Sequence, residues 1–203
     1  MRTNLIIGSV IIYSFLFSLN AFSQDKKVEF QVETGYGIKL SKEDYNAAQF
    51  YITPLYKLND NLLLGAGAGL IYNHRNGTIK EANTNFSIPV YGGAEYIFSS
   101  KGNMKPFINT KIGYGFRSKK YETEDFSQIF TDNNDRINVE YSGGFFISPA
   151  VGLLYPINDG HSFRVSLSYD LQRLKMVLSG SGSSKLQSFH TNSTLSLKVG
   201  WSF

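Results

Sequence analysis

The sequence of 203 residues predicts an all-β fold, an eight-stranded antiparallel up-and-down transmembrane β-barrel. Three observations support this class. Apolar and polar residues alternate with a period of two in nearly every segment after residue 23, which is typical of strands. Short and long connections alternate along the chain, as in a meander whose two ends differ. The apolar face carries aromatic residues near both strand ends and aliphatic residues between them.

Residues 1–23 have the pattern of a secretory signal peptide. After a short positive start, an apolar run extends from Leu5 to Leu19 and is followed by the small residues Ala21 and Ser23. The run is shorter than the roughly 20 residues that a spanning helix needs. We expect cleavage after Ser23, which leaves residues 24–203 as one barrel domain. An uncleaved N-terminal anchor is the alternative.

The composition excludes several classes of protein. The chain has no cysteine, so it forms no disulfide, no zinc–thiolate site and no lipid-modified cysteine. The formal net charge is only +4, and no basic cluster indicates nucleic-acid binding. We therefore expect an exported protein that does not bind nucleic acid and is held together without sulfur.

The first four predicted strands carry the alternation with different residues. Val28–Leu40 alternates Val, Phe, Tyr, Ile and Leu with Glu, Gln, Gly and Lys. Gln49–Leu58 places Phe, Ile, Pro and Tyr on one face, and Asn61–Tyr72 sets Leu and Ala against Gly. In Asn85–Phe98, the residues Phe, Ile, Val, Gly, Ala, Tyr and Phe share one face. Each segment therefore reads as a strand with two unlike faces.

The last four predicted strands follow the same rule. Pro106–Phe116 places Ile, Thr, Ile, Tyr and Phe on one face, and Glu140–Tyr155 alternates Tyr, Phe, Ile, Val and Leu with smaller residues. Ser162–Leu171 sets Phe, Val, Leu and Tyr against Arg, Ser and Asp. Ser193–Phe203 alternates without a fault to the last residue. No stretch after residue 23 has a convincing helical stripe.

The connections between these strands differ in length. The predicted short turns are Leu58–Asn61, Ser99–Lys105 and Pro156–His161. The predicted longer polar segments are Asn73–Thr84, Arg117–Val139 and Gln172–Thr191, with a shorter one near Ser41–Ala47. An even number of strands returns the C-terminus to the side on which the N-terminus began.

One face of the strands is rich in small residues and mixed charges, and we expect it to line the barrel interior. Glycine and serine dominate this face, as the lumen of a narrow barrel requires. A soluble ligand-carrying barrel of the lipocalin type, with its apolar face inside, is the alternative. Charges inside are tolerated when paired, so we predict a lumen charge network whose individual pairs stay open. Its members are Glu29, Glu33, Lys39, Glu95, Lys111, Arg164, Asp170 and Lys198.

Aromatic residues on the opposite face gather near the strand ends. Two aromatic rings with aliphatic residues between them are what the two interfaces of a bilayer select. The predicted girdle next to the short turns includes Phe30, Tyr56, Tyr96, Tyr155 and Phe163. An open sheet in lipid would leave unpaired backbone groups at its edges, so these strands must close into a barrel.

The C-terminal strand carries a resemblance to a known family. In STLSLKVGWSF, the positions Leu195, Leu197, Val199, Trp201 and Phe203 alternate with polar or small residues. Together with the signal peptide, the eight strands and the loop asymmetry, this end resembles the small outer-membrane β-barrels of Gram-negative bacteria, of the OmpA-transmembrane and OmpX type. In that family the terminal Phe and the alternate apolar residues are read by the barrel assembly machinery. The resemblance implies that these five residues form an assembly signal.

The resemblance covers essentially the whole mature chain, from Lys27 to Phe203. It implies a monomer in the cell outer membrane. The implied partners are outer-membrane lipid and lipopolysaccharide, the barrel assembly machinery and periplasmic chaperones. The long segment Arg117–Val139 is then expected outside the cell and the turn Pro156–His161 in the periplasm.

Several short motifs could carry chemistry, but none forms a complete site. His190–Ser193 has the residue types of a lipid A deacylase in the wrong order, and His161–Ser162 lies in a turn. Thr131–Arg136 lacks the glycine and the terminal glutamate of an EF-hand loop. Gly65–Gly69 lies within a strand that no helix follows, so it is no dinucleotide fingerprint. We therefore predict no catalytic residue, no metal site and no cofactor.

Three functions from different classes stay open at this point. The favoured one is a non-enzymatic membrane scaffold that presents extracellular loops for adhesion or envelope interactions. The alternative is a narrow, porin-like channel or conduit for small or hydrophobic molecules. A lipid A-modifying enzyme is the third. Because eight strands leave an interior that side chains can fill, the first is preferred over an aqueous pore.

Overall fold

The computed structural model describes residues 27–40, 45–75, 85–123, 137–158, 160–179 and 185–203. The strands are β1 (Val28–Lys39), β2 (Tyr45–Lys57), β3 (Leu62–Arg75), β4 (Asn85–Ile97), β5 (Lys105–Thr123), β6 (Ile137–Asn158), β7 (His161–Ser179) and β8 (Lys185–Ser202). The described part of the chain contains no helix long and apolar enough to cross a membrane. The expected signal peptide, residues 1–23, lies outside the described residues.

The eight strands form one closed barrel in sequence order, and every neighbouring pair is antiparallel. This confirms the predicted fold class. β1 and β8 close the barrel, with Gln31 opposite Ser202 and Lys39 opposite Thr194. The closure reaches the last residue, because the amide of Phe30 donates to the carbonyl of Phe203 at 2.7 Å and the amide of Phe203 donates back at 3.0 Å.

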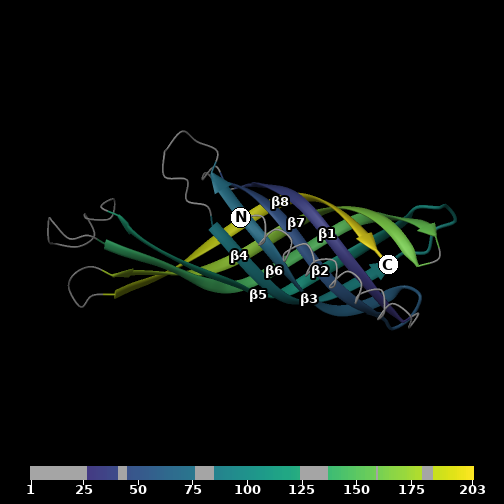
Figure 1. The fold of residues 1–203 in the computed structure, drawn as a ribbon, viewed down its shortest axis with the longest axis horizontal. Coiled ribbons are helices and arrows are strands. Elements are labelled where there is room, and N and C mark those ends of the chain that lie inside the picture. Colours follow the sequence, from purple (N-terminus) through teal and green to yellow (C-terminus); the bar gives the residue numbers. More distant parts are fainter. Residues whose placement is uncertain (1–26, 41–44, 76–84, 124–136, 159, 180–184) are drawn as a thin grey trace, which may run out of the picture.

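The long connections are shorter than the sequence predicts. The segments Arg117–Val139 and Gln172–Thr191 were expected to be loops, but much of each is strand. β7 and β8 pair without interruption from Ser162 opposite Ser202 to Ser179 opposite Lys185. Figure 1 shows the β5–β6 and β7–β8 hairpins extending beyond the rest of the barrel at one end.

The alternation fails in these extensions for a physical reason. Beyond a membrane the outer face of a strand meets water, so polar residues are accepted there while the backbone ladder continues. The stretch Gln172–Lys175 shows this: Arg173 and Lys175 lie on the outer face, whereas Gln172 and Leu174 stay buried inside, and all four residues pair with β8. β2 likewise begins at Tyr45, four residues before its predicted start at Gln49.

Prolines interrupt the hydrogen-bond ladders within the wall. Pro54, Pro89 and Pro149 each lie where the pairing of their strand with one neighbour skips two residues. Proline has no amide hydrogen to donate, so a gap in the ladder at these positions is expected. The barrel still closes, because the remaining residues of each strand keep their register.

Glycines on the inner face make room for large side chains of neighbouring strands. A Cβ on Gly69 would lie 2.4 Å from Cδ1 of Tyr51, and one on Gly152 would lie 2.5 Å from Cζ of Phe107. A Cβ on Gly200 would lie 2.9 Å from Cγ of Arg164. Small residues opposite large ones are how a narrow barrel fills its interior at high density.

We predict that Gly69→Ala destabilises the barrel by about 1–3 kcal/mol, since the new methyl group meets both the Tyr51 ring and the carbonyl of Phe50. The matched control is Gly92→Ala on the outer face, where the nearest atom to an added Cβ is 3.9 Å away. Denaturant unfolding of the refolded proteins in detergent measures both. Equal unfolding midpoints for the two variants would contradict the filled interior.

Candidate functional site

In the part of the lumen next to the short turns, one buried arginine pairs with two carboxylates. The guanidinium of Arg164 on β7 meets the carboxylate of Glu95 on β4 across the barrel, with N–O distances of 2.7 and 3.0 Å. Both side chains are 1% exposed. A second carboxylate, that of Glu29 on β1, lies 3.6 Å from Arg164 and 3.2 Å from Lys57. The bidentate geometry fixes both partners in orientation as well as charge.

Two buried lysines occupy the middle of the lumen. Lys111 on β5 pairs with Glu33 on β1 at 2.5 Å, and Lys198 on β8 pairs with Asp170 on β7 at 2.9 Å. Both ammonium groups lie over the ring of Tyr51, at 5.1 and 4.7 Å from its centroid. An aromatic face attracts cations, so the ring links the two pairs into one cluster.

Asp170 is the most heavily hydrogen-bonded carboxylate among the described residues. Besides Lys198, it accepts hydrogen bonds from the hydroxyl of Ser148, from Ser196 at 2.7 Å and from the amide of Gln49 at 2.8 Å. A buried carboxylate needs several donors to offset lost hydration. The serines that the sequence reveals as small lumen residues therefore also act as donors.

The structure thus gives partners to the charge pattern seen in the sequence. It brings seven of the eight residues into three ion-paired groups: Arg164 with Glu95 and Glu29, Lys111 with Glu33, and Lys198 with Asp170. Lys39 lies on the same face of β1 as Glu29 and Glu33, but it is half-buried and near the other end of the strand. Sequence alone could not assign these pairs, because they depend on relative heights within the closed barrel.

An aromatic cluster inside the barrel was missed by the sequence analysis. Tyr51, Tyr91 and Phe146 are buried and pack together, with ring centroids 5.9 to 6.4 Å apart. The hydroxyl of Tyr91 hydrogen-bonds that of Thr53 at 2.9 Å. The doublet Phe145–Phe146 holds the signal that could have revealed the cluster, since one of two adjacent strand residues must face inward. At this level, large side chains fill the lumen.

A polar cavity of about 290 Å³ opens at the short-turn end of the barrel. Its lining includes the charged residues Glu29, Lys57, Asp60 and Lys105, together with His161. Arg164, only 1% exposed, lies deeper in the lumen. This mouth cavity can admit water or a small polar solute as far as the Arg164 ion pairs.

The outer wall exposes apolar side chains over most of the barrel. Of the predicted girdle, Tyr56, Tyr96, Tyr155 and Phe163 are 40 to 45% exposed. Phe30 differs: it is only 9% exposed, and its ring stacks on that of Phe203 at a centroid distance of 6.1 Å. Phe30 therefore belongs to the seam between β1 and β8, because the terminal residue lies directly against it.

The C-terminal strand presents its alternate apolar residues to the outside. Leu197, Val199 and Trp201 are exposed, and Leu195 and Phe203 are half-buried on the same face. The polar residues between them, Ser196, Lys198 and Ser202, are buried inside. The five residues of the predicted assembly signal thus share the outer face of the last strand.

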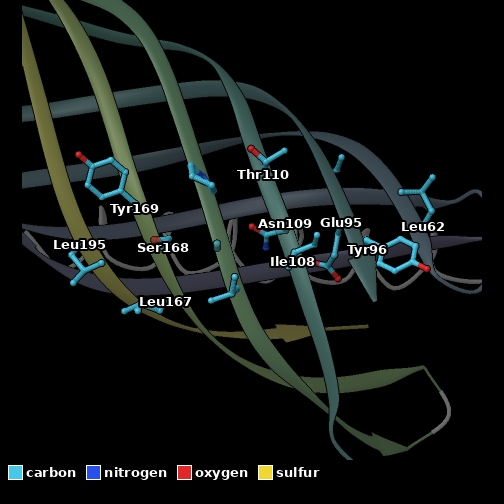
Figure 2. Close-up of a pocket in the computed structure, with 14 residues that line it drawn as sticks. Leu62, Glu95, Tyr96, Ile108, Asn109, Thr110, Leu167, Ser168, Tyr169 and Leu195 are labelled. Carbon is cyan, nitrogen blue, oxygen red and sulfur yellow. The ribbon is translucent and has the colours of Figure 1, made fainter. Parts of the chain in front are cut away.

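A shallow groove of about 570 Å³ crosses this outer wall. Its floor is made of the short side chains of Ala94, Thr110 and Pro149, on the adjacent strands β4, β5 and β6. Figure 2 shows the lining residues spread over successive strands, from Leu62 on β3 to Leu195 on β8. We call this feature the outer-wall groove. Nearly all of its surface is apolar.

The motifs weighed for catalysis do not come together. Among the described residues, no three His, Asp or Glu side chains are grouped so that they could hold a metal ion. His161 lies at a turn with its ring 6.1 Å from that of Trp201, and His190 pairs with Leu174 in the β7–β8 extension. Thr131–Arg136 lies outside the described residues.

We predict that Arg164→Met destabilises the barrel by about 3–5 kcal/mol, because it leaves the carboxylate of Glu95 buried without its cation. Adding Glu95→Gln should recover part of the loss, as a double-mutant cycle in denaturant would show. The control is Lys57→Met, which removes a cation that is 42% exposed and should cost at most about 1 kcal/mol. A harmless Arg164→Met would refute the network.

Comparison with known proteins identifies the fold. No protein-family model matches the chain, and no curated protein matches its sequence. Neisserial surface protein A matches with a TM-score of 0.58 and 11% identity, over 87% of this chain and 96% of that one. Outer membrane protein OprG from Pseudomonas aeruginosa matches at 0.56 and 12%, over 87% and 95%. Outer membrane protein AlkL matches at 0.53 and 12%, over 87% and 88%. The chain has the fold of the small eight-stranded β-barrels of the outer membrane.

Proposed function

We propose that this protein is a non-enzymatic integral barrel of the outer membrane that presents its extended hairpins and loops for adhesion or envelope interactions. The filled lumen is the observation that carries the proposal. Tyr51 and Phe146 have 0% exposure, and Arg164 and Lys198 have 1%. A wall that exposes apolar residues around a filled interior suits an anchor in lipid.

The two ends of the barrel support an orientation. The short-turn end carries both the C-terminus and compact turns such as the one from Phe98 to Met104. The other end carries the β5–β6 and β7–β8 extensions (Figure 1). Outer-membrane barrels place short turns in the periplasm and long connections outside the cell. The extensions are therefore the surface offered to partners.

The base of the β7–β8 extension suits the outer leaflet. Arg173 lies over the ring of Phe189, with its guanidinium carbon 4.5 Å from the ring centroid, and Phe189 is 62% exposed. Lys175 follows two residues later on the same face of β7. Cations beside an exposed aromatic ring match the phosphate groups and acyl chains of lipopolysaccharide. This supports lipopolysaccharide as a partner of the outward-facing hairpin.

A narrow conduit is the second candidate, and the mouth cavity is the observation in its favour. The cavity of about 290 Å³ admits solutes from the short-turn side. Beyond it, a solute would have to displace the Arg164–Glu95 pair and then the cluster around Tyr51. Buried charge pairs are expensive to separate, so permeation would require a large rearrangement.

We predict that the purified protein passes no steady ion current in planar lipid bilayers, because the side chains at the level of Tyr51 close the lumen. Insertion is verified in the same sample by the shifted gel mobility of the unheated barrel. Stepwise conductance from inserted protein would favour the conduit over the scaffold.

The proposed orientation predicts a pattern of cysteine labelling. Because the sequence has no native cysteine, only the introduced cysteine of each variant can react. A membrane-impermeant maleimide on intact cells should label Gln187→Cys, which lies exposed on the β8 extension. It should not label Asn103→Cys, in the exposed turn between β4 and β5, until the outer membrane is permeabilised. The reverse pattern would invert the topology.

The last strand supports recognition by the barrel assembly machinery. We predict that Phe203→Ser lowers the amount of assembled barrel in cells far more than it lowers the unfolding midpoint of refolded barrel. The reason is that the outward face of the last strand is open to a receptor before the barrel closes. The control is Phe163→Ser, an exposed aromatic at the same end on β7. Equal assembly of both variants would show that Phe203 is not read.

A further inference from the structure

The outer-wall groove differs from the rest of the apolar wall in the size of its floor residues. Ala94 is opposite Thr110, and Thr110 is opposite Pro149, so three short side chains form one continuous row across β4, β5 and β6. Larger side chains border this row, among them Ile108 on β5 and Val151 on β6. The row is therefore the floor of a trough bordered by larger side chains.

The direction of the trough follows from the tilt of the strands. The row of short side chains ends on β6, and the lining of the groove continues past Tyr169 on β7 to Leu195 on β8. From β4 to β8 the groove thus crosses four strand spacings of about 4.8 Å, about 19 Å in all. In a barrel whose strands are tilted by about 40°, a line across the strands rises about 12 Å along the barrel axis over that span. One leaflet contributes about 15 Å of hydrocarbon. The trough thus runs obliquely through about one leaflet.

The trough begins at the short-turn end. Tyr96 is the last residue but one of β4, and Leu62 is the first residue of β3. The other end, at Tyr169 and Leu195, lies well inside β7 and β8. A long chain that enters from the short-turn interface therefore ends near the middle of the membrane.

We propose that the outer-wall groove binds one acyl chain of a glycerophospholipid from the leaflet on the short-turn side. The inference rests on the proposed placement in the outer membrane. The groove is continuous with the lipid-facing wall, and its surface is almost entirely apolar. Its volume of about 570 Å³ lies within the usual range of ligand pockets, about 300–1,000 Å³. A flexible hydrocarbon chain fits a long, shallow trough better than a protein surface does.

The turn at the start of the groove supplies a cation for the phosphate group. Lys101 is exposed in the turn that follows β4, close in sequence to Tyr96. Lys105, the first residue of β5, lines the mouth cavity instead. In this proposal the exposed Lys101 supplies the cation for the phosphate, and the ring of Tyr96 lies at the level of the interface. A phospholipid, rather than lipopolysaccharide, occupies the leaflet at this end.

Native mass spectrometry of the barrel, extracted from membranes in mild detergent, tests the proposal. The wild-type barrel should retain one phospholipid. Ala94→Leu and Thr110→Leu fill the floor and should lower the retained fraction several-fold. The control Ala68→Leu adds the same bulk on the exposed outer face of β3, outside the groove, and should retain the lipid. Lys101→Gln should weaken retention of anionic phosphatidylglycerol after exchange into its vesicles.

The outcomes separate the groove from the proposed function. If the barrel is absent from the outer-membrane fraction, the proposed placement fails and the groove proposal fails with it. If the barrel is inserted but retains no lipid, retains lipopolysaccharide instead, or loses phospholipid equally in Ala68→Leu and Ala94→Leu, only the groove proposal is overturned. Loss confined to the floor variants supports it.

Discussion

The hydrogen-bonded closure of β1 onto β8 is the constraint on which the rest of the structure depends. The backbone bonds between Phe30 and Phe203 complete a ring in which no strand of the barrel body is left with an open edge. Lipid offers no hydrogen-bond partners, so only a closed ring can expose its outer wall to a bilayer. The same closure sets a narrow interior of fixed diameter. Everything inside must then fill that space without voids or stranded charge.

The lumen meets this demand with two kinds of complementarity. In shape, Gly69 and Gly152 leave room for the rings of Tyr51 and Phe107. In charge, each buried cation meets a carboxylate from another strand, and the Tyr51 ring joins two of the resulting pairs. The Lys111–Glu33 and Arg164–Glu95 pairs cross the barrel between non-neighbouring strands, whereas Lys198–Asp170 joins the adjacent strands β8 and β7. The pairs therefore stabilise the closed barrel and neutralise the charges buried in its lumen. Removing one partner costs more free energy than the pair itself contributes, because it leaves the other charge buried alone.

The two ends of the barrel differ in structure. The short-turn end is compact and carries the Phe30–Phe203 contact at one end of the seam, the mouth cavity and the start of the outer-wall groove. The opposite end extends four strands beyond the others and carries the cation–aromatic contact between Arg173 and Phe189. The filled barrel body, with Tyr51 and Phe146 buried in its lumen, lies below these exposed strands.

The sequence by itself determined the all-β class, the eight strands, the outward aromatic face and the identity of the charges inside, because all four depend on a period of two along single strands. It also marked Phe203 as part of a structured end.

Only the tertiary structure decided which side chains are partners inside the lumen. Arg164 meets Glu95, and the inner cluster of Tyr51, Tyr91 and Phe146 forms, because closure and register set the height of each side chain. The extensions of β5 to β8 also needed the fold, since a hydrated outer face accepts polar residues and the alternation that reveals a strand is lost. Phe30 was assigned to the aromatic girdle because it lies on the outward face of its strand. In the closed barrel its ring packs on that of Phe203, at the seam between β1 and β8. The alternation along one strand indicates which face of the sheet a residue lies on. Contacts across a closed barrel depend instead on the register of all eight strands.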